Sequence, residues 1–430
     1  MHLLPRSLRS VPAVLAVLVT AGCVIVSSTS HTPPVAEEDA STTPRDAGPR
    51  PDGSSLRDAG GLTRAEATSG MLASIGARVV LPTYRTLATE AAALEDATRA
   101  YGESGSADDL AAAREAWRRT IAVAQRAELM QFGPAGMQTS DVLGGLGLRD
   151  AIYSWPAFNR CRIDVVTQTG GYEDLDAPAT QGLFMRGLGA IEYLLFHAGA
   201  DHGCLPGASI TVDDAAWSAL GETAIRERRA DHAHALAQRV SSAAGELLTA
   251  WDPSGGDFAG QLARAGQSGS VYASTQSALN AIFSAMYYLD RQIKDDKLEA
   301  LTGACATAGC PELLESRFAH RSSEHFLENL RGFQMLYLGG VPSELDAMGF
   351  DDLLLTVGAA ELEADLRVAI EAAIAVAEAL PSVDPTNLAE HVDAYASMHA
   401  AVERIDDLFK VELKTALALE LPMGAPEDND

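Results

Sequence analysis

Two glutamates interrupt helix faces that are otherwise apolar, and their carboxylates are the first candidates for chemistry. Glu128 follows Trp117, Ile121 and Ala124 and precedes Phe132, in a series that advances by three or four residues. Residues at this spacing share one face of a helix, so the Glu128 carboxylate is predicted to face the core. A buried charge is costly unless it is paired or protonated. Glu128 is therefore expected either to pair with an arginine or to bind a ligand.

The second glutamate, Glu192, is the only charged residue in the run from Gly187 to Phe196. Gly187, Gly189 and Ala190 lie beside it, and small residues are tolerated best where another backbone or a ligand comes close. Two acids from different helices, each on an apolar face, could form a buried cation site or share a proton. A purely structural role for Glu192 is the alternative that these residues leave open.

A third group of polar residues lies just before a helix that is predicted to begin at Ser322. Glu315, Arg317 and His320 precede this start. A loop could therefore carry their side chains into a cleft between helical bundles.

Other histidines are predicted to have no role in binding. His325 and Glu328 are three residues apart and could reach one metal ion. They lie off the apolar stripe of their helix, however, and a solvent-exposed position is favoured. His232 and His234 are two residues apart, a spacing that does not share a helix face, and both are expected at the surface.

The composition and the missing motifs exclude several classes of function. The sequence has 32 basic and 59 acidic residues and a net charge of -27, and removal of a leader with two arginines would bring it to -29. Such a surface repels nucleic acid and attracts cations. H-E-x-x-H, G-x-S-x-G, Walker A and C-x-x-C-H motifs are absent from the sequence. No catalytic residue is assigned.

The N-terminus has the features of a bacterial lipoprotein signal peptide, over residues 1–22. Two arginines precede a twelve-residue apolar stretch that ends at Ala21, Gly22 and Cys23. This stretch is shorter than the roughly 20 residues of a membrane-spanning helix. It resembles a lipobox, in which Cys23 would be acylated, for example with palmitate, and become the new N-terminus. An ordinary secreted protein with an incidental cysteine is the alternative.

Residues 23–62 are predicted to form a disordered tether. They are rich in Ser, Thr, Pro, Asp and Gly and contain no aromatic residue, so they cannot bury enough apolar surface to offset the entropy of ordering. Val24 after the cysteine, where Asp is absent, resembles lipoproteins of the Gram-negative outer membrane. We therefore expect a lipid bilayer as a partner through acylated Cys23, and a chain that faces the periplasm.

Beyond the tether, the hydrophobic pattern is helical almost throughout, and no stretch alternates long enough to indicate a sheet. Gly and Pro between the helices are typical of antiparallel bundles. We predict an all-α fold with an N-terminal bundle over 63–212 and a C-terminal bundle over 213–430. The Arg-Gly segments at Arg186 and Arg331 resemble each other, which indicates either a duplicated bundle or chance similarity.

The cysteines that remain after Cys23 predict two disulfides in an oxidising envelope. The simplest pairing joins Cys161 to Cys204 and Cys305 to Cys310. Four cysteines allow three pairings, so the connectivity stays open. A zinc cluster is less favoured because it would require C-x-x-C spacing.

Taken in order, several segments of the chain resemble the imelysin family of bacterial envelope proteins, over roughly residues 65–425. The segments are Trp117 with Glu128 and Phe132-Gly133-Pro134, Trp155-Pro156, the run from Gly187 to Phe196, and Glu315-Ser316-Arg317-Phe318. The resemblance implies two helical bundles with a site where they meet. It also implies that Glu192 has Glu128, Arg317 and His320 as companions in binding a metal or another ligand.

The family has been associated with two activities, metallopeptidase action and iron acquisition. The peptidase assignment depends on a G-x-H-x-x-E motif, which is present here only as Gly187, Gly189 and Glu192. The missing imidazole removes the motif's best transition-metal ligand. The favoured hypothesis is a lipid-anchored protein that binds iron or another divalent cation and delivers it to an uptake transporter or receptor. A peptidase with another catalytic arrangement, and a structural or protein-binding lipoprotein without a small ligand, are the alternatives.

Overall fold

The structure is a computed structural model that describes residues 61–137, 142–177, 180–302 and 310–422. Cys23, with the predicted signal peptide and nearly all of the tether, lies outside the described residues. Within these ranges the chain forms helices and loops without a strand, which confirms the predicted all-α class. None of the described helices is long and apolar enough to span a membrane.

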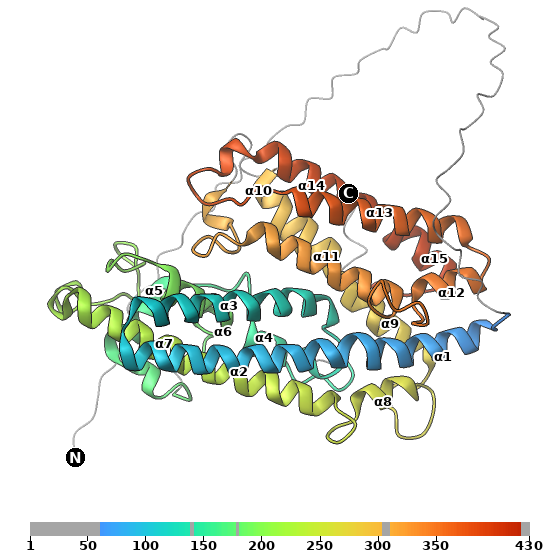
Figure 1. Ribbon diagram of the computed structural model, residues 1–430, viewed down its shortest axis with the longest axis horizontal. Helices are drawn as coiled ribbons and strands as arrows, with labels where there is room; N and C mark the ends of the chain where they lie inside the picture. Colours follow the sequence, from blue (N-terminus) through green and yellow to red (C-terminus); the bar gives the residue numbers. More distant parts are fainter. Residues whose placement is uncertain (1–60, 138–141, 178–179, 303–309, 423–430) are drawn as a thin grey trace, which may run out of the picture. The chain divides into compact units, whose positions relative to one another are not determined.

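The α-helices follow one another along the chain as shown in Figure 1. Their bounds are α1 Arg64–Ser74, α2 Leu81–Ser104, α3 Ala107–Ala127, α4 Leu148–Ile152, α5 Arg160–Thr169, α6 Gly187–Phe196, α7 Asp214–Trp251, α8 Phe258–Ala263, α9 Thr275–Met286, α10 Ala300–Thr302, α11 Ser322–Leu338, α12 Phe350–Thr356, α13 Ala360–Ala379, α14 Val392–Asp407 and α15 Lys414–Leu417.

Shorter helical segments join these helices or extend them. The π-helical segments are η1 Ile75–Val80, η7 Leu289–Glu299 and η10 Leu408–Leu413. The 3-10 segments are η2 Glu128–Met130, η3 Gly133–Ala135, η4 Gly171–Glu173, η6 Leu183–Met185, η8 Pro311–Leu313 and η9 Leu388–Glu390.

Local sequence accounts for several helix ends. Thr63 and Glu66 form a capping box at the start of α1, in which each side chain accepts from the other residue's backbone amide. Pro82 lies just after the π-helical segment η1, where helical backbone continues from η1 into α2, and its missing amide hydrogen interrupts the regular hydrogen bonding of the helix. The π-helical segment η1 separates α1 from α2 just before this proline. Gly105 ends α2 in the left-handed conformation, with φ 62°.

Helix α3 packs against two groups of helices. One group contains α2 and α6, and the other contains α11, which in turn packs against α13. The buried Trp117 indole of α3 donates a hydrogen bond of 2.8 Å to the Leu188 carbonyl of α6. Contacts between α1 and α12 provide a second connection between the two groups. Residues far apart in the sequence are therefore held together along α3.

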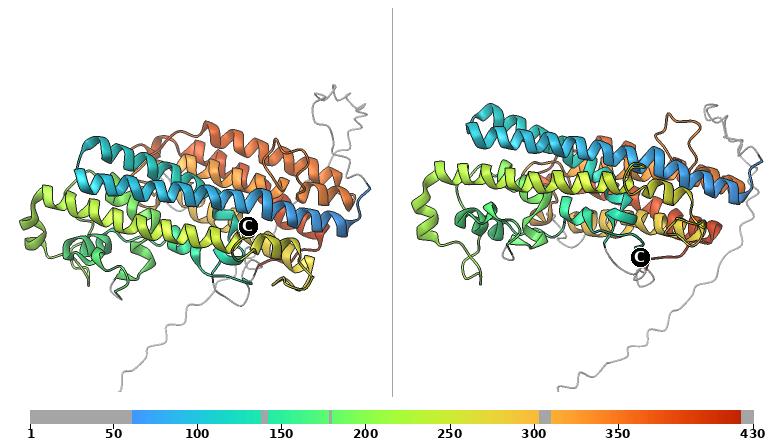
Figure 2. Two further views of the ribbon diagram at one scale, coloured as in Figure 1. Left: turned by 60° about the horizontal axis from the view of Figure 1, so that its bottom comes forward. Right: turned by 90° about the horizontal axis from the view of Figure 1, so that it is seen from below.

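Helix α7 begins just after the predicted bundle boundary at residue 212, yet it packs against helices that precede it. Its neighbours are α2, α4, α5 and α6, and both Figures 1 and 2 show α2 and α7 side by side. The described residues, from 61 to 422, all belong to one compact unit by their contacts. The division into bundles at residue 212 stays a prediction.

The surface position predicted for His232 is wrong. This side chain is 1% exposed, and its Nδ1 lies 2.9 Å from the Thr167 hydroxyl of α5. Its ring stacks on Tyr172 at 5.3 Å between centroids. Because α5 and the following turn cover this side of α7, a polar face that the sequence pattern assigns to solvent is buried instead.

Candidate functional site

A cavity of about 600 Å³ lies among four segments that are distant in the sequence. They are the loop 153–158, helix α6, the π-helical segment η7 and the segment 312–318. Six carboxylates line it, those of Glu192, Asp295, Asp296, Glu299, Glu312 and Glu315. Arg317 is the only basic residue among the described residues that line the cavity. The cavity is therefore strongly acidic.

Glu192 is buried at this cavity and is held by hydrogen bonds rather than by a cation. Its side chain is 3% exposed. One carboxylate oxygen, Oε1, accepts from the Ser316 hydroxyl at 3.2 Å and from the backbone amides of Phe318 and Ala319 at 3.0 and 2.9 Å. No Arg, Lys or His side chain in the described part of the chain forms an ion pair with it. Burial raises the pKa of Glu192 to about 7, and the three hydrogen bonds oppose that rise.

The two glycines near Glu192 differ in whether the local structure requires glycine. Gly187 has φ 65°, and a Cβ there would lie 2.6 Å from the Ile152 carbonyl oxygen, so both its conformation and its space require glycine. Gly189 has neither restriction, because a Cβ would meet nothing closer than the Tyr153 ring at 3.8 Å. Gly189 lines the cavity. Its missing side chain therefore leaves space next to Glu192.

Glu315 also lines the cavity, but its charge is neutralised by two buried residues that do not line the cavity, Lys297 and His325. Its side chain is 2% exposed, and Lys297 Nζ and His325 Nδ1 each lie 3.0 Å from one of its oxygens. The Tyr153 hydroxyl and the Gln125 amide each donate to it at 2.8 Å. Burial alone would raise the pKa of Glu315, but the positive charges of Lys297 and His325 hold it well below its usual range.

Lys297 is the centre of the buried network behind Glu315. Its Nζ donates to the side-chain oxygens of Gln125 and Asn329, each at 3.0 Å. The same ammonium lies 5.5 and 5.4 Å from the ring centroids of Trp155 and Tyr288. The network thus fixes the segment that carries Glu315 against α3 and α11.

The prediction that His325 and Glu328 are exposed is wrong. They are 2% and 8% exposed. His325 contacts Glu315, and Glu328 accepts hydrogen bonds from Arg126 of α3. The apolar stripe of α11 shows only one buried face, whereas α3 and the segment before α11 cover further faces of the same helix.

Glu128 is buried elsewhere and has an arginine partner. Its side chain is 2% exposed, and Arg149 donates to it through Nε at 3.0 Å and Nη2 at 2.5 Å. Both residues line a separate cavity of about 20 Å³, too small for an organic ligand. The structure therefore gives Glu128 the buried Glu–Arg pair that the sequence left open as one of two possibilities.

Arg317 and His320 have different positions. The Arg317 guanidinium lies over the rings of Phe158 and Phe318, at 5.8 and 4.9 Å from their centroids, in the wall of the cavity. The His320 side chain is 49% exposed, lies 3.9 Å from Asp384 and does not line the cavity. Of the four ligand-binding candidates, the structure brings together Glu192 and Arg317.

The sequence placed Glu315 among the residues that a loop could carry into a cleft, but Lys297 and His325, which contact Glu315, were not selected as ligand-binding candidates. Glu315 had a signal, because it begins the Glu-Ser-Arg-Phe segment. Lys297 had none, since a lysine in a stretch rich in charged residues is usually exposed. Within the described ranges, no three His, Cys, Asp or Glu side chains are grouped so that they could hold one metal ion.

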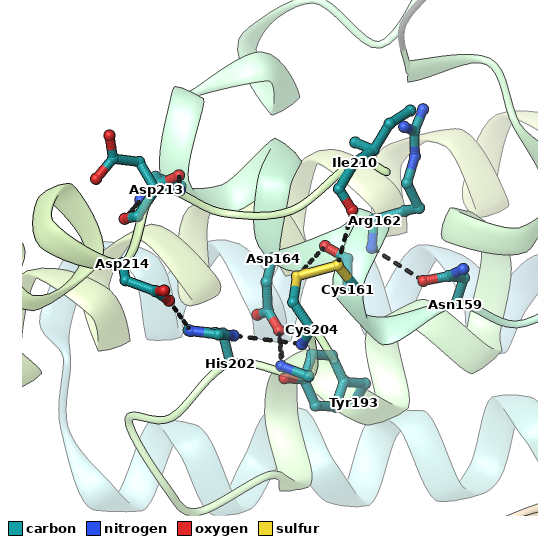
Figure 3. The surroundings of a disulfide bond; sticks show 12 residues. Asn159, Cys161, Arg162, Asp164, Tyr193, His202, Cys204, Ile210, Asp213 and Asp214 are labelled. Atoms are coloured by element: carbon teal, nitrogen blue, oxygen red, sulfur yellow. Dashed lines mark hydrogen bonds and ion pairs between the residues drawn. A yellow bond between two sulfur atoms is a disulfide. The ribbon is translucent and has the colours of Figure 1, made fainter. Parts of the chain in front are cut away.

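A disulfide joins α5 to the loop that follows α6 (Figure 3). Cys161 and Cys204 are joined with an S–S distance of 2.01 Å across a sequence separation of 43, as predicted. Nearby, the buried Asp164 accepts hydrogen bonds from the Tyr193 hydroxyl of α6 at 2.7 Å and from the Gly203 amide at 2.8 Å. The predicted partner of Cys310, Cys305, lies outside the described residues, and that pairing stays a prediction.

Comparison with known sequences gives one family and a short match to a relative. A family model described as imelysin matches residues 80–414. Iron-regulated protein A of Synechococcus elongatus is 33% identical over 101 residues, which are 24% of this chain and 26% of that protein. The match thus spans about a quarter of the relative's length.

Two crystal structures share the fold. A protein assigned as an iron-regulated protein A precursor, from Parabacteroides distasonis, has a TM-score of 0.65 and 19% identity, and the match covers 83% of this chain and 97% of that one. An imelysin-like protein from Psychrobacter arcticum has a TM-score of 0.60 and 16% identity, with 84% and 98% covered. At these identities the similarity shows the fold alone.

Proposed function

We propose that this protein is a cell-envelope protein that binds a cation in the acidic cavity beside Glu192. The premise is that the chain belongs to the imelysin family. The proposed role is connected with iron, and the cation is cargo rather than a resident cofactor. The names of two similar proteins support the connection with iron, since one is an iron-regulated protein A and the other, from another organism, is assigned as an iron-regulated protein A precursor.

One observation carries the proposal. Glu192 is a buried carboxylate at a cavity, and no cationic side chain of the described residues forms an ion pair with it. Arg317 in the cavity wall acts on it through space, without an ion pair. Glu315 and Glu128, which are equally buried, each have a cationic partner. A buried carboxylate without a counter-ion resists ionisation, and a bound cation would relieve this cost. The net charge of -27 would also draw cations toward the protein.

The proposal places the chain at a membrane surface. Acylation of Cys23 would anchor it to a bilayer, with residues 23–62 as the tether, and the apolar stretch that ends at this cysteine supports the assignment. An outer-membrane position facing the periplasm, and a transporter or receptor that receives the cation, belong to the same proposal. Cys23→Ala should move the protein from the membrane fraction to a soluble pool, and persistence in salt-washed membranes would contradict the anchor.

A zinc-peptidase function is not favoured by the geometry. Gly189 stands where the family motif has its histidine, and the described residues provide no group of three ligands for a metal. A catalytic zinc site requires three protein ligands and an open position for water. We therefore propose a binding function.

The test of the proposed function is elemental analysis combined with equilibrium dialysis. Wild type purified from its native envelope should carry a metal in near-stoichiometric amount, or take one up as a salt or chelate. Glu192→Gln should lose this metal, whereas Glu246→Gln, an exposed acid of α7 with the same change of charge, should retain it. A wild type that carries and takes up no metal in either form would contradict the proposal.

A further inference from the structure

We infer that the cavity binds a metal chelate of positive charge, that is, a cation that keeps its own organic ligands, rather than a bare ion. This inference rests on the proposed function and specifies the class of its ligand. It follows from the size of the cavity, the chemistry of its walls and the distribution of its carboxylates.

The size of the cavity fits an organic ligand. Its volume of about 600 Å³ falls within the roughly 300 to 1,000 Å³ that is usual for pockets binding small organic molecules. A bare cation requires several protein ligand atoms within about 2.0 to 2.6 Å of one point. Within the ranges described, no three carboxylate, imidazole or thiol side chains provide such a point.

The walls of the cavity are aromatic as well as acidic. Tyr153, Trp155, Phe158 and Phe318 line it, and aromatic faces are typical of sites that bury organic ligands. Arg317 lies in the same wall, over two of these rings. A guanidinium would repel a bare cation, but it can donate charge-assisted hydrogen bonds to the oxygen donors of a chelator. The wall therefore suits the organic part of a complex.

No three of the described carboxylates at the cavity converge on one point. Asp296, Glu299 and Glu312 are exposed, and Asp295 lies 3.4 Å from Lys294. Glu315 is already neutralised by Lys297 and His325. Dispersed carboxylates attract a positive complex by their summed field without displacing its ligands. This arrangement favours a ligand that carries net positive charge.

Glu192 and Gly189 provide the most specific part of the argument. Glu192 is 3% exposed and lines the cavity. One turn before it on α6, Gly189 leaves space, since a Cβ there would have only ordinary contacts with Tyr153 and Phe158. A larger side chain at position 189 should fill this space without disturbing the helix. The absence of a side chain thus makes room for a bulky ligand beside a buried carboxylate.

The test is calorimetric titration of the mature protein with four probes. They are the ferric complex of a linear trihydroxamate with a free ammonium group, the ferric complex of citrate, and the aqua ions of iron(II) and zinc(II). The cationic chelate should bind at least tenfold more tightly than the other three, a difference of about 1.4 kcal/mol. Its visible hydroxamate-to-iron absorption band should persist in the bound state, because the iron keeps its ligands.

Two variants of Gly189 locate the binding event. Gly189→Leu should abolish chelate binding by filling the space, and Gly189→Ala should weaken it less. Gly189→Ala also covers the case in which the larger variant fails to fold, as judged by circular dichroism. Unchanged chelate binding in a folded Gly189→Leu variant would overturn the inference.

The remaining outcomes separate the inference from the proposed function. If an aqua ion binds more tightly than the chelate, or if the anionic citrate complex binds best, the inference is overturned and metal binding by the cavity stands. Loss of the hydroxamate band on binding would also overturn it, because the protein would then have taken the bare iron. Failure of all four probes to bind would contradict both.

Discussion

Glu128 and Glu192 are two buried carboxylates that differ in their partners and in the size of the cavity beside them. They are 2% and 3% exposed, and both lie in the half of the chain that precedes α7. Arg149 neutralises Glu128, whereas the hydrogen-bond partners of Glu192 among the described residues are a hydroxyl and two backbone amides. Backbone amides stabilise a carboxylate without supplying a counter-charge. The comparison shows that similar sequence anomalies can mark a structural ion pair in one place and an open site in another.

The largest effect is expected where the ion pair is broken. Glu128→Gln should lower the free energy of unfolding by about 3 to 5 kcal/mol, because it leaves the guanidinium of Arg149 buried with less compensating charge. Asp150, which also contacts Arg149, should keep the loss toward the lower end. Chemical denaturation of wild type and variant measures the difference. A loss below about 1 kcal/mol would contradict this expectation, because the buried pair would then contribute no more to stability than a surface salt bridge does.

Removal of the disulfide should have the next largest effect and should act on the Glu192 side. The double variant Cys161→Ser with Cys204→Ser should lose about 2 to 4 kcal/mol of stability, because the unfolded chain is no longer closed into a loop. Loosening α5 should also disturb α6 through the bond between Asp164 and Tyr193. Hydrogen exchange should therefore increase in α6 more than around Glu128, and equal increases at the two positions would contradict this coupling.

The dependence of stability on pH distinguishes Glu192 from its neighbour Glu315. The pKa of Glu192 is raised from 4.5 to about 7, so the unfolded chain loses this proton first as the pH rises. Between about pH 4.5 and pH 7 the contribution of Glu192 to the free energy of unfolding should fall by up to about 3 kcal/mol. The lowered pKa of Glu315 has the opposite sign, since its contribution is present above pH 4.5 and is lost as the pH falls below that value.

Paired denaturation curves of wild type and Glu192→Gln across this range isolate the Glu192 contribution. The difference in stability should shift in favour of the variant as the pH rises toward about 8. Glu246→Gln, which removes a charge from an exposed position, should show no such trend. A constant difference between wild type and Glu192→Gln at all pH values would show that Glu192 does not titrate abnormally.

The helices themselves could be predicted from the sequence because their signals are local. The start of α11 at Ser322 follows from such a signal. The Cys161–Cys204 bond belongs to the simplest of the three pairings that the sequence left open. The anomalous glutamates were also found correctly as buried residues, since each interrupts an apolar stripe.

The parts that could not be predicted depend on several segments at once. His325 and Glu328 were assigned to solvent because a single apolar stripe does not reveal a helix covered on more than one face. Lys297 gave no signal, since its partners Gln125, Asn329 and Glu315 come from three other segments. The amides that hold Glu192 belong to the backbone after Ser316, and their direction depends on the path of that loop.

The most direct test of the central claim is thermal unfolding of wild type and Glu192→Gln at about pH 8, with and without the cationic ferric trihydroxamate. If Glu192 is a buried carboxylate without a counter-ion, the variant without ligand should melt at the same or a higher temperature than wild type. The chelate should raise the melting temperature of wild type and leave that of the variant unchanged. A wild type that does not respond to the chelate, together with a variant that melts far lower, would contradict the account and make Glu192 a structural residue.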